Sequence, residues 1–393
     1  MTRAKLRAVT GTSDEAYQEQ ILPHVSRTFA LTIPQLPAGL RSAVTSAYLL
    51  CRIADTIEDE PAVSPAQAYV YLQRFAAVVC GREDARALAR EVEGCLTERT
   101  LPAERDLMHN MERVVRLTQR LSREQRAAIQ HCVELMCAGM HDFQQSASVS
   151  GLARSSDLDS YCYYVAGVVG EMLTELFCAY SAEIARHREA LFELAASFGQ
   201  GLQMTNILKD MWEDRSRGAC WLPQDVFTRH GIELAQLTPG RSEQSFGAGL
   251  RELIAVAHGH LRNAMTFTLL IPREEGGIRR FCLWAVGLAV LTLRRIAGNP
   301  QFTAGAQVKV SHSAVALTRL LTSLAVRHDR TLLQLFDWAA GDLPLAAPAE
   351  VCLRSRAATV AAHQPAAHGG YAGSVLRGQL SATPLRTDGS AAQ

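Results

Sequence analysis

The sequence predicts an all-α fold, a single helical bundle, and three observations carry that prediction. Apolar residues recur every three or four positions through most of residues 15–345, which is the spacing of one helix face. Strong helix formers, above all Ala, Leu, Arg and Glu, dominate the same region. Alternating apolar and polar runs bounded by hairpin turns, the mark of strands, are nearly absent.

Five segments show the helical periodicity most clearly, and we expect a helix in each. One of them has its own start signal, because Ser64 stands in an N-cap position and Pro65 follows at the first helical position. The longest apolar run ends in Arg294 and Arg295 and is too short to span a bilayer, so we expect a buried helix there. The five segments are residues 40–60, 66–80, 122–143, 191–214 and 281–293.

The domain prediction follows from composition along the chain. No shift in composition divides the helical region, so we expect one domain over residues 16–350, although the chain has 393 residues. Residues 1–15 form an N-terminal extension without the apolar stretch of a secretory signal. Residues 351–393 are rich in Ala, Gly, Ser and Pro and lack an apolar stripe, which predicts a disordered tail.

Bulk composition excludes some classes of partner. Hydrophobic residues make up 48% of the chain, and the formal net charge is +1. The chain therefore has enough apolar residues for a large core. The near-neutral net charge does not favour nucleic acid as a partner. The ten cysteines include no CxxC pair, so we expect reduced thiols in a cytoplasmic protein.

The first chemical signal is an acidic pair at the end of an apolar helix. Asp55 and Asp59 stand four residues apart, so they share a helix face, and Arg52 lies on that face too. Like charges at this spacing repel each other, and an apolar neighbourhood raises the cost unless a cation is supplied. Taken alone, the pair also fits a solvated helix end.

A second acidic pair favours a bound cation over a solvated helix end. Asp210 and Asp214 are again four residues apart, and Gln203 and Asn206 precede them on the same face. These polar residues form a stripe along one face of a helix whose other residues are mostly apolar. Two such helices facing each other would enclose an acidic cavity in the bundle, as helical bundles do when they build metal sites.

Carboxylate and amide oxygens without His or Cys favour hard cations, Mg²⁺ above all. Mg²⁺ completes its shell with water and phosphate oxygens, so the implied ligand is a diphosphate. An apolar, water-excluding pocket beside it suits the ionisation of an allylic diphosphate. Basic residues near the two motifs in sequence that would hold the diphosphate are Arg27, Arg52, Lys209, Arg215 and Arg217.

These motifs resemble the squalene and phytoene synthase family, head-to-head prenyl transferases of the all-α isoprenoid synthase fold. The resemblance covers roughly residues 20–330. The resemblance rests on several motifs that occur in the same order as in the family, because a single DxxxD motif would be weak evidence. The blocks are "SRTFA" (26–30), "YLLCRIADTIEDE" (48–60), "YCYYVAGVVGEMLTELF" (161–177) and "GLQMTNILKDMWEDRSRGACWLPQD" (201–225).

The resemblance implies a two-step reaction on two molecules of farnesyl diphosphate. The first step gives presqualene diphosphate, and in squalene synthases NADPH then reduces the rearranged cation. Tyr161 matches the tyrosine assigned to proton removal, and the four aspartates would hold Mg²⁺. The resemblance further implies substrate contacts for Ser26, Arg27, Phe29, Tyr48, Arg52, Val165, Gln203, Asn206, Lys209, Arg215 and Arg217.

The product depends on a later block. Residues 281–311, "FCLWAVGLAVLTLRRIAGNPQFTAGAQVKVS", resemble the C-terminal block of squalene synthases. Phe281 would line the NADPH pocket and Lys309 would meet a cofactor phosphate, which favours squalene as product. A phytoene or dehydrosqualene synthase, or an enzyme that releases presqualene diphosphate, stays open. Lys209 departs from the family, because an arginine usually stands there.

Two interpretations of other kinds are weaker. A catalytically dead, lipid-binding helical protein would have lost these aspartates, and head-to-tail enzymes usually carry DDxxD, which "DTIED" does not match. The insoluble hydrocarbon product leads us to expect peripheral membrane contact. The sequence leaves the oligomeric state open.

Overall fold

A computed structural model describes residues 13–26, 28–144, 148–239, 244–347 and 351, all within one compact unit, 1–355. The all-α prediction is confirmed. In these residues the backbone is helical or irregular, and its only β feature is an isolated bridge between Leu152 and Pro223. Val351, the first residue of the predicted disordered tail, is buried. The rest of that tail lies outside the described part, and the predicted domain limits stay a prediction.

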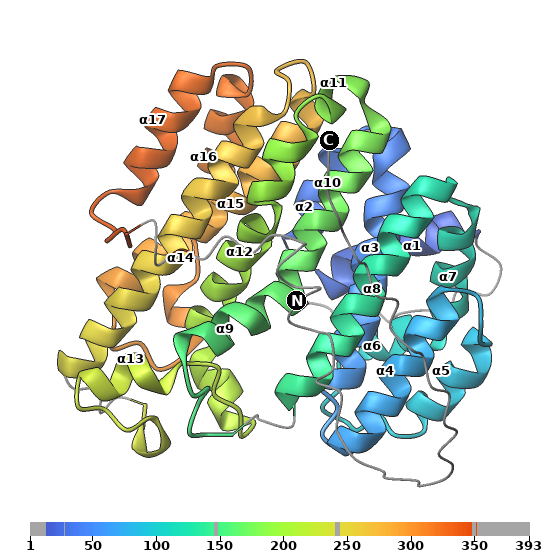
Figure 1. Ribbon diagram of the computed structural model, residues 1–393, viewed down its shortest axis with the longest axis horizontal. Helices are drawn as coiled ribbons and strands as arrows, with labels where there is room; N and C mark the ends of the chain where they lie inside the picture. Colours follow the sequence, from blue (N-terminus) through green and yellow to red (C-terminus); the bar gives the residue numbers. More distant parts are fainter. Residues whose placement is uncertain (1–12, 27, 145–147, 240–243, 348–350, 352–393) are drawn as a thin grey trace, which may run out of the picture. The chain divides into compact units, whose positions relative to one another are not determined.

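The first half of the chain forms a group of helices that pack around α3, except for α2, which contacts α15. Figure 1 shows this group on one side of the unit. These helices are α1 (Asp14–Val25), α2 (Phe29–Thr32), α3 (Ala38–Glu58), α4 (Pro65–Val79), α5 (Ala85–Glu93), α6 (Pro102–His109), α7 (Met111–Arg120) and α8 (Arg123–Gln144).

The second half of the chain packs around the long helix α12, which contacts α10, α14 and α15. A π-helical turn, Tyr163–Gly167, joins α9 to α10. The helices are α9 (Ser155–Cys162), α10 (Val168–Tyr180), α11 (Ala182–Ala185), α12 (Arg188–Ser216), α13 (Gln224–Arg229), α14 (Gln244–Leu270), α15 (Gly276–Gly298), α16 (His312–Ala325) and α17 (Asp329–Ala340).

The five helices expected from periodicity are present as α3, α4, α8, α12 and α15. The start signal of α4 works as predicted. The Ser64 hydroxyl accepts a hydrogen bond from the backbone of Gln67, and the Gln67 side chain accepts one from the backbone of Ser64. This capping box satisfies two amide groups that the first turn leaves open.

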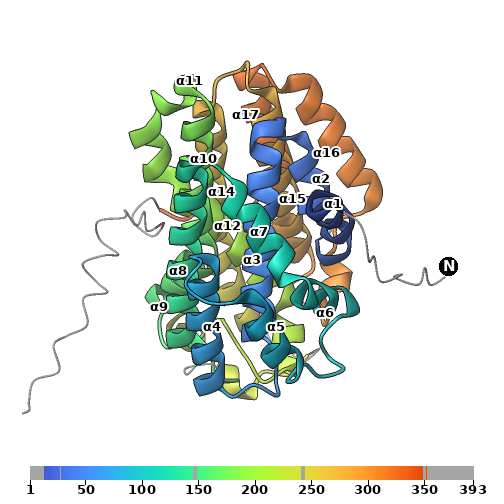
Figure 2. The ribbon, with the colours of Figure 1, turned by 90° about the vertical axis from the view of Figure 1, so that its right-hand side faces the viewer.

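The central helix α10 joins the two halves, because it contacts both α3 and α12. Figure 2 shows α3, α10 and α12 together in the middle of the bundle, with α16 and α17 at its edge. The contact between α12 and the π-helical turn is close. A Cβ added at Gly199 would lie 1.9 Å from the carbonyl oxygen of Ala166, so glycine is required there.

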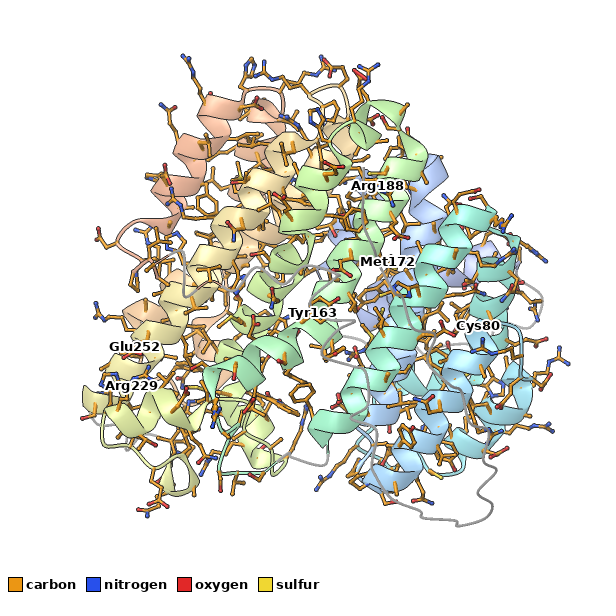
Figure 3. All side chains as sticks on the ribbon, viewed as in Figure 1. Cys80, Tyr163, Met172, Arg188, Arg229 and Glu252 are labelled. Carbon is orange, nitrogen blue, oxygen red and sulfur yellow. The ribbon has the colours of Figure 1, made fainter. Side chains whose placement is uncertain are left out.

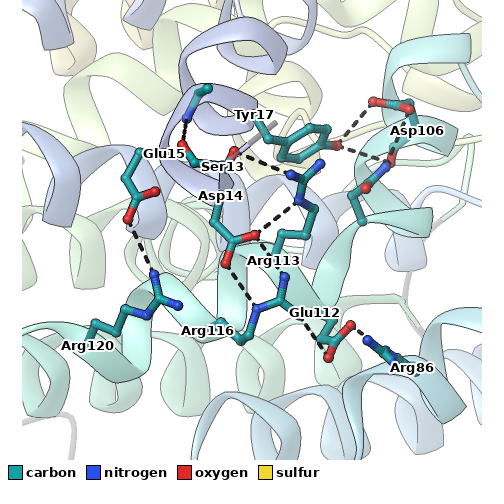
Figure 4. A network of polar contacts seen from close by, with 12 residues as sticks. Ser13, Asp14, Glu15, Tyr17, Arg86, Asp106, Glu112, Arg113, Arg116 and Arg120 are labelled. Carbon is teal, nitrogen blue, oxygen red and sulfur yellow. Dashed lines mark hydrogen bonds and ion pairs between the residues drawn. The ribbon is translucent and has the colours of Figure 1, made fainter. Parts of the chain in front are cut away.

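Helix α1 is held to α7 by a buried carboxylate (Figure 4). Asp14 accepts hydrogen bonds from Arg113 at 3.1 Å and from Arg116 at 2.8 Å. The Tyr17 hydroxyl reaches Asp106 at 3.1 Å in the same network. These bonds fix the N-terminal helix against the half of the bundle that carries α3.

Within the described residues, two helical stretches are apolar and long enough to cross a membrane by length and composition alone, Ser155–Tyr180 and Gly276–Gly298. The most apolar window of each is 72% and 56% buried inside the unit, respectively. Core helices of soluble proteins pass the same test, so this is weak support for a membrane span. The burial agrees with the expected core helix at 281–293.

Candidate active site

A cavity of about 410 Å³ lies between α3, α10 and α12. Part of its wall is apolar, and Met172, labelled on α10 in Figure 3, belongs to that part. Another part is acidic. The carboxylates that line the cavity are Asp55, Glu58, Asp59, Asp210 and Asp214.

Helix α3 presents its polar face to the cavity and its apolar face to the core. Leu49, Leu50 and Ile53 are fully buried against neighbouring helices. The cavity side repeats every three or four residues, as a single helix face does. It consists of Val44, Tyr48, Cys51, Arg52, Asp55 and Glu58, followed by Asp59 at the C-cap.

Helix α12 supplies the opposite wall with the polar stripe predicted from the sequence, Gln203, Asn206, Asp210 and Asp214. The two stripes face each other closely enough to interact. The charge of Asp59 on α3 contributes to the raised pKa of Asp214 on α12, after burial and the charge of Asp210. The predicted meeting of two acidic helices in one cavity is therefore present.

The site holds more negative charge than its own cations offset. Burial raises the pKa of Asp55 to about 7, with the charge of Asp59 adding and that of Arg52 opposing. Burial, followed by the charge of Asp210, raises the pKa of Asp214 to about 7. The Asp55 side chain is 38% exposed, because it opens into the cavity. An added cation would favour the ionised form of both groups.

The family model described as "Squalene/phytoene synthase" matches residues 22–314 and so includes both acidic helices. The chain belongs to the squalene/phytoene synthase family. As a member of this family it is a prenyltransferase, and the resemblance in the four sequence blocks is confirmed.

Individual relatives agree with the family. A squalene synthase of Candida albicans is 28% identical over 80% of this chain and 67% of the relative. A squalene synthase of Eremothecium gossypii is 29% identical over 71% and 62% of the two chains. That of Rattus norvegicus is 28% identical over 72% and 64%. The chain thus spans about two thirds of the length of these relatives.

Solved structures share the fold. TcSQS in complex with the ligand BPH1237 superimposes with a TM-score of 0.67 at 24% identity, over 83% of this chain and 90% of that one. A dehydrosqualene synthase in complex with a ligand gives a TM-score of 0.57 at 21% identity, over 82% and 96%. These likenesses establish the isoprenoid synthase fold and leave the product open.

The donor set of this family member fits Mg²⁺. It consists of the carboxylate oxygens of the four aspartates and the side-chain amides of Gln203 and Asn206. In the part of the chain that the structure describes, no His lines the cavity, and the one cysteine in its lining, Cys51, lies one turn before Asp55. Oxygen donors of this kind suit a hard cation. Among the described residues, no three His, Cys, Asp or Glu side chains are gathered tightly enough to form a metal cage. The aspartates would therefore hold Mg²⁺ together with oxygens of a bound diphosphate, as is usual for this ion.

Most of the predicted substrate residues line the cavity. Arg52 forms an ion pair with Asp55 at 3.6 Å and a second one with Glu104 of α6. The Tyr48 hydroxyl donates to the carbonyl of Val25 at 2.9 Å. The predicted residues in the lining are Phe29, Tyr48, Arg52, Tyr161, Val165, Gln203, Asn206, Arg217 and Phe281, besides the four aspartates.

Three predicted substrate residues do not line this cavity, and a fourth, Arg27, lies outside the described residues. Arg215 donates to the carbonyls of Val149 at 2.9 Å and Ala235 at 2.7 Å, so it supports a neighbouring loop. Ser26 accepts from the backbone N–H of Phe29 at 2.9 Å. Lys209 contacts Asp210 at 3.0 Å but lines a neighbouring cavity.

That neighbouring cavity measures about 550 Å³ and carries Lys209, Lys309 and His312 in its wall. It shares Phe29, Leu202, Asn206 and Asp210 with the first cavity. The sequence placed Phe281 and Lys309 in one pocket. The structure instead places Phe281 in the first cavity, its ring 6.4 Å from that of Phe29, and Lys309 in the second.

Tyr161 lies in the cavity wall between two aromatic rings. Trp221 stacks on it at 4.1 Å, and Phe143 meets it edge-on at 5.5 Å. Burial raises the pKa of Tyr161 well above its usual range, and the nearby charges of Glu58 and Asp59 add to this effect. The phenol is therefore neutral at physiological pH.

Sequence reasoning missed three residues of the site. Glu58 follows Asp55 by three positions, so helical spacing could have placed it on the cavity face. Trp221 lies in the loop after α12, and Glu104 lies on α6. No local signal ties either of them to the aspartates, because only the packing of the bundle brings them to Tyr161 and Arg52.

Proposed function

We propose that this chain is a squalene synthase. It joins two molecules of farnesyl diphosphate head to head in the presence of Mg²⁺, forms presqualene diphosphate, and reduces the rearranged product to squalene with NADPH. The observation that carries the proposal is the meeting of both aspartate pairs and Tyr161 in the wall of one cavity. Family membership and the squalene synthases among the relatives support it.

The acidic part of the cavity would bind the diphosphate of the substrate. Asp55 and Asp59 from one side and Asp210 and Asp214 from the other would hold Mg²⁺. Magnesium, when bound, supplies the positive charge that makes diphosphate a good leaving group. Arg52 and Arg217 line the same cavity and would contact phosphate oxygens directly.

The apolar wall shelters the cation that forms when diphosphate leaves. Phe198, Met172, Leu173 and Val165 line the cavity and exclude water from it. The stacked rings of Tyr161 and Trp221 present π faces that stabilise positive charge. Tyr161, held neutral, would relay the proton lost in the first step: its own O–H proton would pass to a diphosphate oxygen as its oxygen takes the proton from the cation.

The second cavity supports the reductive step. Lys309 and Lys209 offer positive charge for a dinucleotide phosphate, and Phe29, Leu202 and Asn206 form the shared wall toward the first cavity. NADPH, when bound, supplies the hydride that ends the reaction. A place for NADPH beside the first cavity supports squalene rather than dehydrosqualene as the product, because only squalene requires a hydride.

The test is a product assay. Purified protein is incubated with farnesyl diphosphate and Mg²⁺, with and without NADPH, and the extract is analysed by mass spectrometry. Squalene that forms only with NADPH is the expected result. Dehydrosqualene or presqualene diphosphate as the final product, with NADPH present, would keep the condensation and overturn the reductive step. Lys309→Gln should weaken NADPH binding, measured by nucleotide fluorescence, while condensation continues.

A further inference from the structure

Helices α16 and α17 carry an apolar face that no described part of the chain covers. Leu317, Leu320 and Leu324 follow one another at spacings of three and four residues, so they lie on one side of α16. They are 46%, 57% and 72% exposed, and Trp338 of α17 is 63% exposed. We call these four residues the α16–α17 face. Figures 1 and 2 show both helices at the edge of the bundle.

A groove of about 100 Å³ joins the two helices of this face. Leu317 and Trp338 both line it, and α15 forms its floor with Leu283, Val286 and Val290. Apart from two threonines its lining is apolar. Leu317 and Trp338 therefore belong to one apolar surface, and Leu320 and Leu324 extend it along the same side of α16 as Leu317.

Exposed arginines lie on the two helices of the face and on the link between them. Arg319, Arg327 and Arg330 are exposed, and within the described part of the chain none of them has an acidic partner. The Arg319 guanidinium lies over the ring of Trp284, 4.6 Å from its centroid. Arg280 and Arg319 line a shallow hollow that also includes Leu320.

The acidic residues of the same two helices are already paired elsewhere or lie apart from the face. Asp329 binds Arg273 at 2.6 Å and Arg279 at 2.7 Å. Asp337 pairs with Arg262 at 3.2 Å. The surface that remains for a partner is apolar at its centre and cationic at its border.

We infer that the α16–α17 face docks this protein on an anionic lipid bilayer. Exposed leucines on a helix beside arginines are the pattern of helices that lie in a membrane interface. Tryptophan prefers that interface because its ring is apolar and its N–H is polar. Arginine keeps its charge at the headgroups while its stem lies along apolar groups.

A second copy of the chain fits this face less well. A symmetric dimer through the face would place the same patch of both copies together. Arg319, Arg327 and Arg330 of one copy would then approach their equivalents without acidic partners. Anionic headgroups instead supply the missing negative charge.

The location of the face relates it to the cavities. One side of α15 lines the groove, and Ala285, Leu288 and Ala289 on another side line the second cavity. Docking through the face would therefore place the bilayer one helix away from that cavity. The inference goes beyond the proposed reaction and does not depend on it.

Co-sedimentation with vesicles tests the inference, in the absence of any substrate. Vesicles of phosphatidylcholine with phosphatidylglycerol are mixed with the wild type and with Leu320→Glu/Leu324→Glu. We expect the double variant to partition into the vesicles at least about tenfold less than the wild type, because it lacks two aliphatic side chains that the bilayer would bury. Val70→Glu is the matched control, since Val70 is 51% exposed on α4, away from the face, and should sediment like the wild type.

Two further measurements make the result specific. Trp338 fluorescence should shift to the blue on vesicle binding and be quenched by brominated lipid, and Trp338→Phe should remove that change. Arg319→Gln/Arg327→Gln should reduce binding to anionic vesicles far more than to pure phosphatidylcholine.

Three outcomes would overturn the inference. The wild type would fail to sediment, or Val70→Glu would weaken binding as much as the leucine variant. Alternatively, the wild type would be a dimer in solution that Leu320→Glu/Leu324→Glu dissociates, and would not bind vesicles. Since no substrate is present, failure here leaves the proposed reaction untouched, and a failed product assay leaves the docking face untouched.

Discussion

The indole of Trp221 lies parallel to the phenol ring of Tyr161, with ring centroids 4.1 Å apart and planes inclined by 5°. Tyr161 comes from the end of α9, and Trp221 comes from the loop behind α12. The stack therefore fixes the Tyr161 ring from outside its own helix and adds a second π face to the cavity wall.

This stack predicts a role for Trp221 in turnover. Trp221→Leu should lower kcat about five- to thirtyfold, since loss of a desolvated π face costs the cation about 1–2 kcal/mol. Trp221→Phe should retain more activity, and Mg²⁺-dependent diphosphate binding should be unchanged in both variants. Equal kcat in Trp221→Leu and the wild type would contradict the role.

The sequence was sufficient for the fold and the acidic face of the site, because both rest on helical spacing within single segments. Asp55 and Asp59, or Gln203 and Asp214, share a face wherever their helix lies. It was not sufficient for contacts that depend on how helices pack. Glu104 and Trp221 meet the site across the bundle, and no spacing rule relates them to it.

Arg215 shows that a residue close to the site in sequence can still point away from it. It stands one residue after Asp214, yet its side chain leaves the cavity and binds two loop carbonyls. Arg217, two residues further on, lines the cavity instead. Proximity in sequence placed both arginines near the aspartates, but the direction of each side chain depends on how the chain leaves α12.

Glu104 is predicted to position Arg52. It pairs with Arg52 from α6, and its side chain is 13% exposed. Glu104→Gln should raise KM for farnesyl diphosphate about three- to tenfold with a smaller change in kcat, because Arg52 loses its fixed orientation. Glu98→Gln, an exposed acid before α6, is the control. A lower kcat with unchanged KM would argue against positioning.

Mg²⁺ binding should depend on pH near neutrality. Asp55 and Asp214 have pKa values of about 7 in the fold, against 3.8 without it. Metal binds the ionised carboxylates, so Mg²⁺ affinity should rise as pH increases through 7 and then level off. Calorimetry of Mg²⁺ with a farnesyl thiodiphosphate, in buffers of different ionisation heat, measures the protons released. No proton release at pH 6 would contradict the raised pKa values.

The same two groups predict the pH dependence of stability without metal. When folding raises the pKa of a carboxyl, its contribution to the free energy of unfolding is fully present below pH 3.8. That contribution is lost as the pH rises through about 7, because the fold then has to hold a buried charge. Asp55→Asn should therefore flatten the fall of the free energy of unfolding between pH 4 and pH 7. Denaturant unfolding at several pH values measures this, and an unchanged slope in Asp55→Asn would refute it.

Gly199 should tolerate no side chain. A Cβ there would lie 1.9 Å from the carbonyl oxygen of Ala166, so Gly199→Ala should destabilise the fold by about 3 kcal/mol or more. Gly298→Ala is the matched control, because an added Cβ meets nothing within 4 Å. Helix propensity should make that variant neutral or slightly more stable. Urea unfolding distinguishes the two, and equal stabilities would show that α12 can move away.

The central claim is that aspartates from α3 and α12 together hold one Mg²⁺-bound diphosphate. Release of diphosphate from farnesyl diphosphate measures it most directly, in the wild type, Asp55→Asn, Asp214→Asn and the control Glu189→Gln, an exposed acid on α12. We expect Mg²⁺-dependent release to fall at least about a hundredfold in both aspartate variants and to persist in the control. Undiminished Mg²⁺-dependent release by Asp55→Asn would contradict the claim.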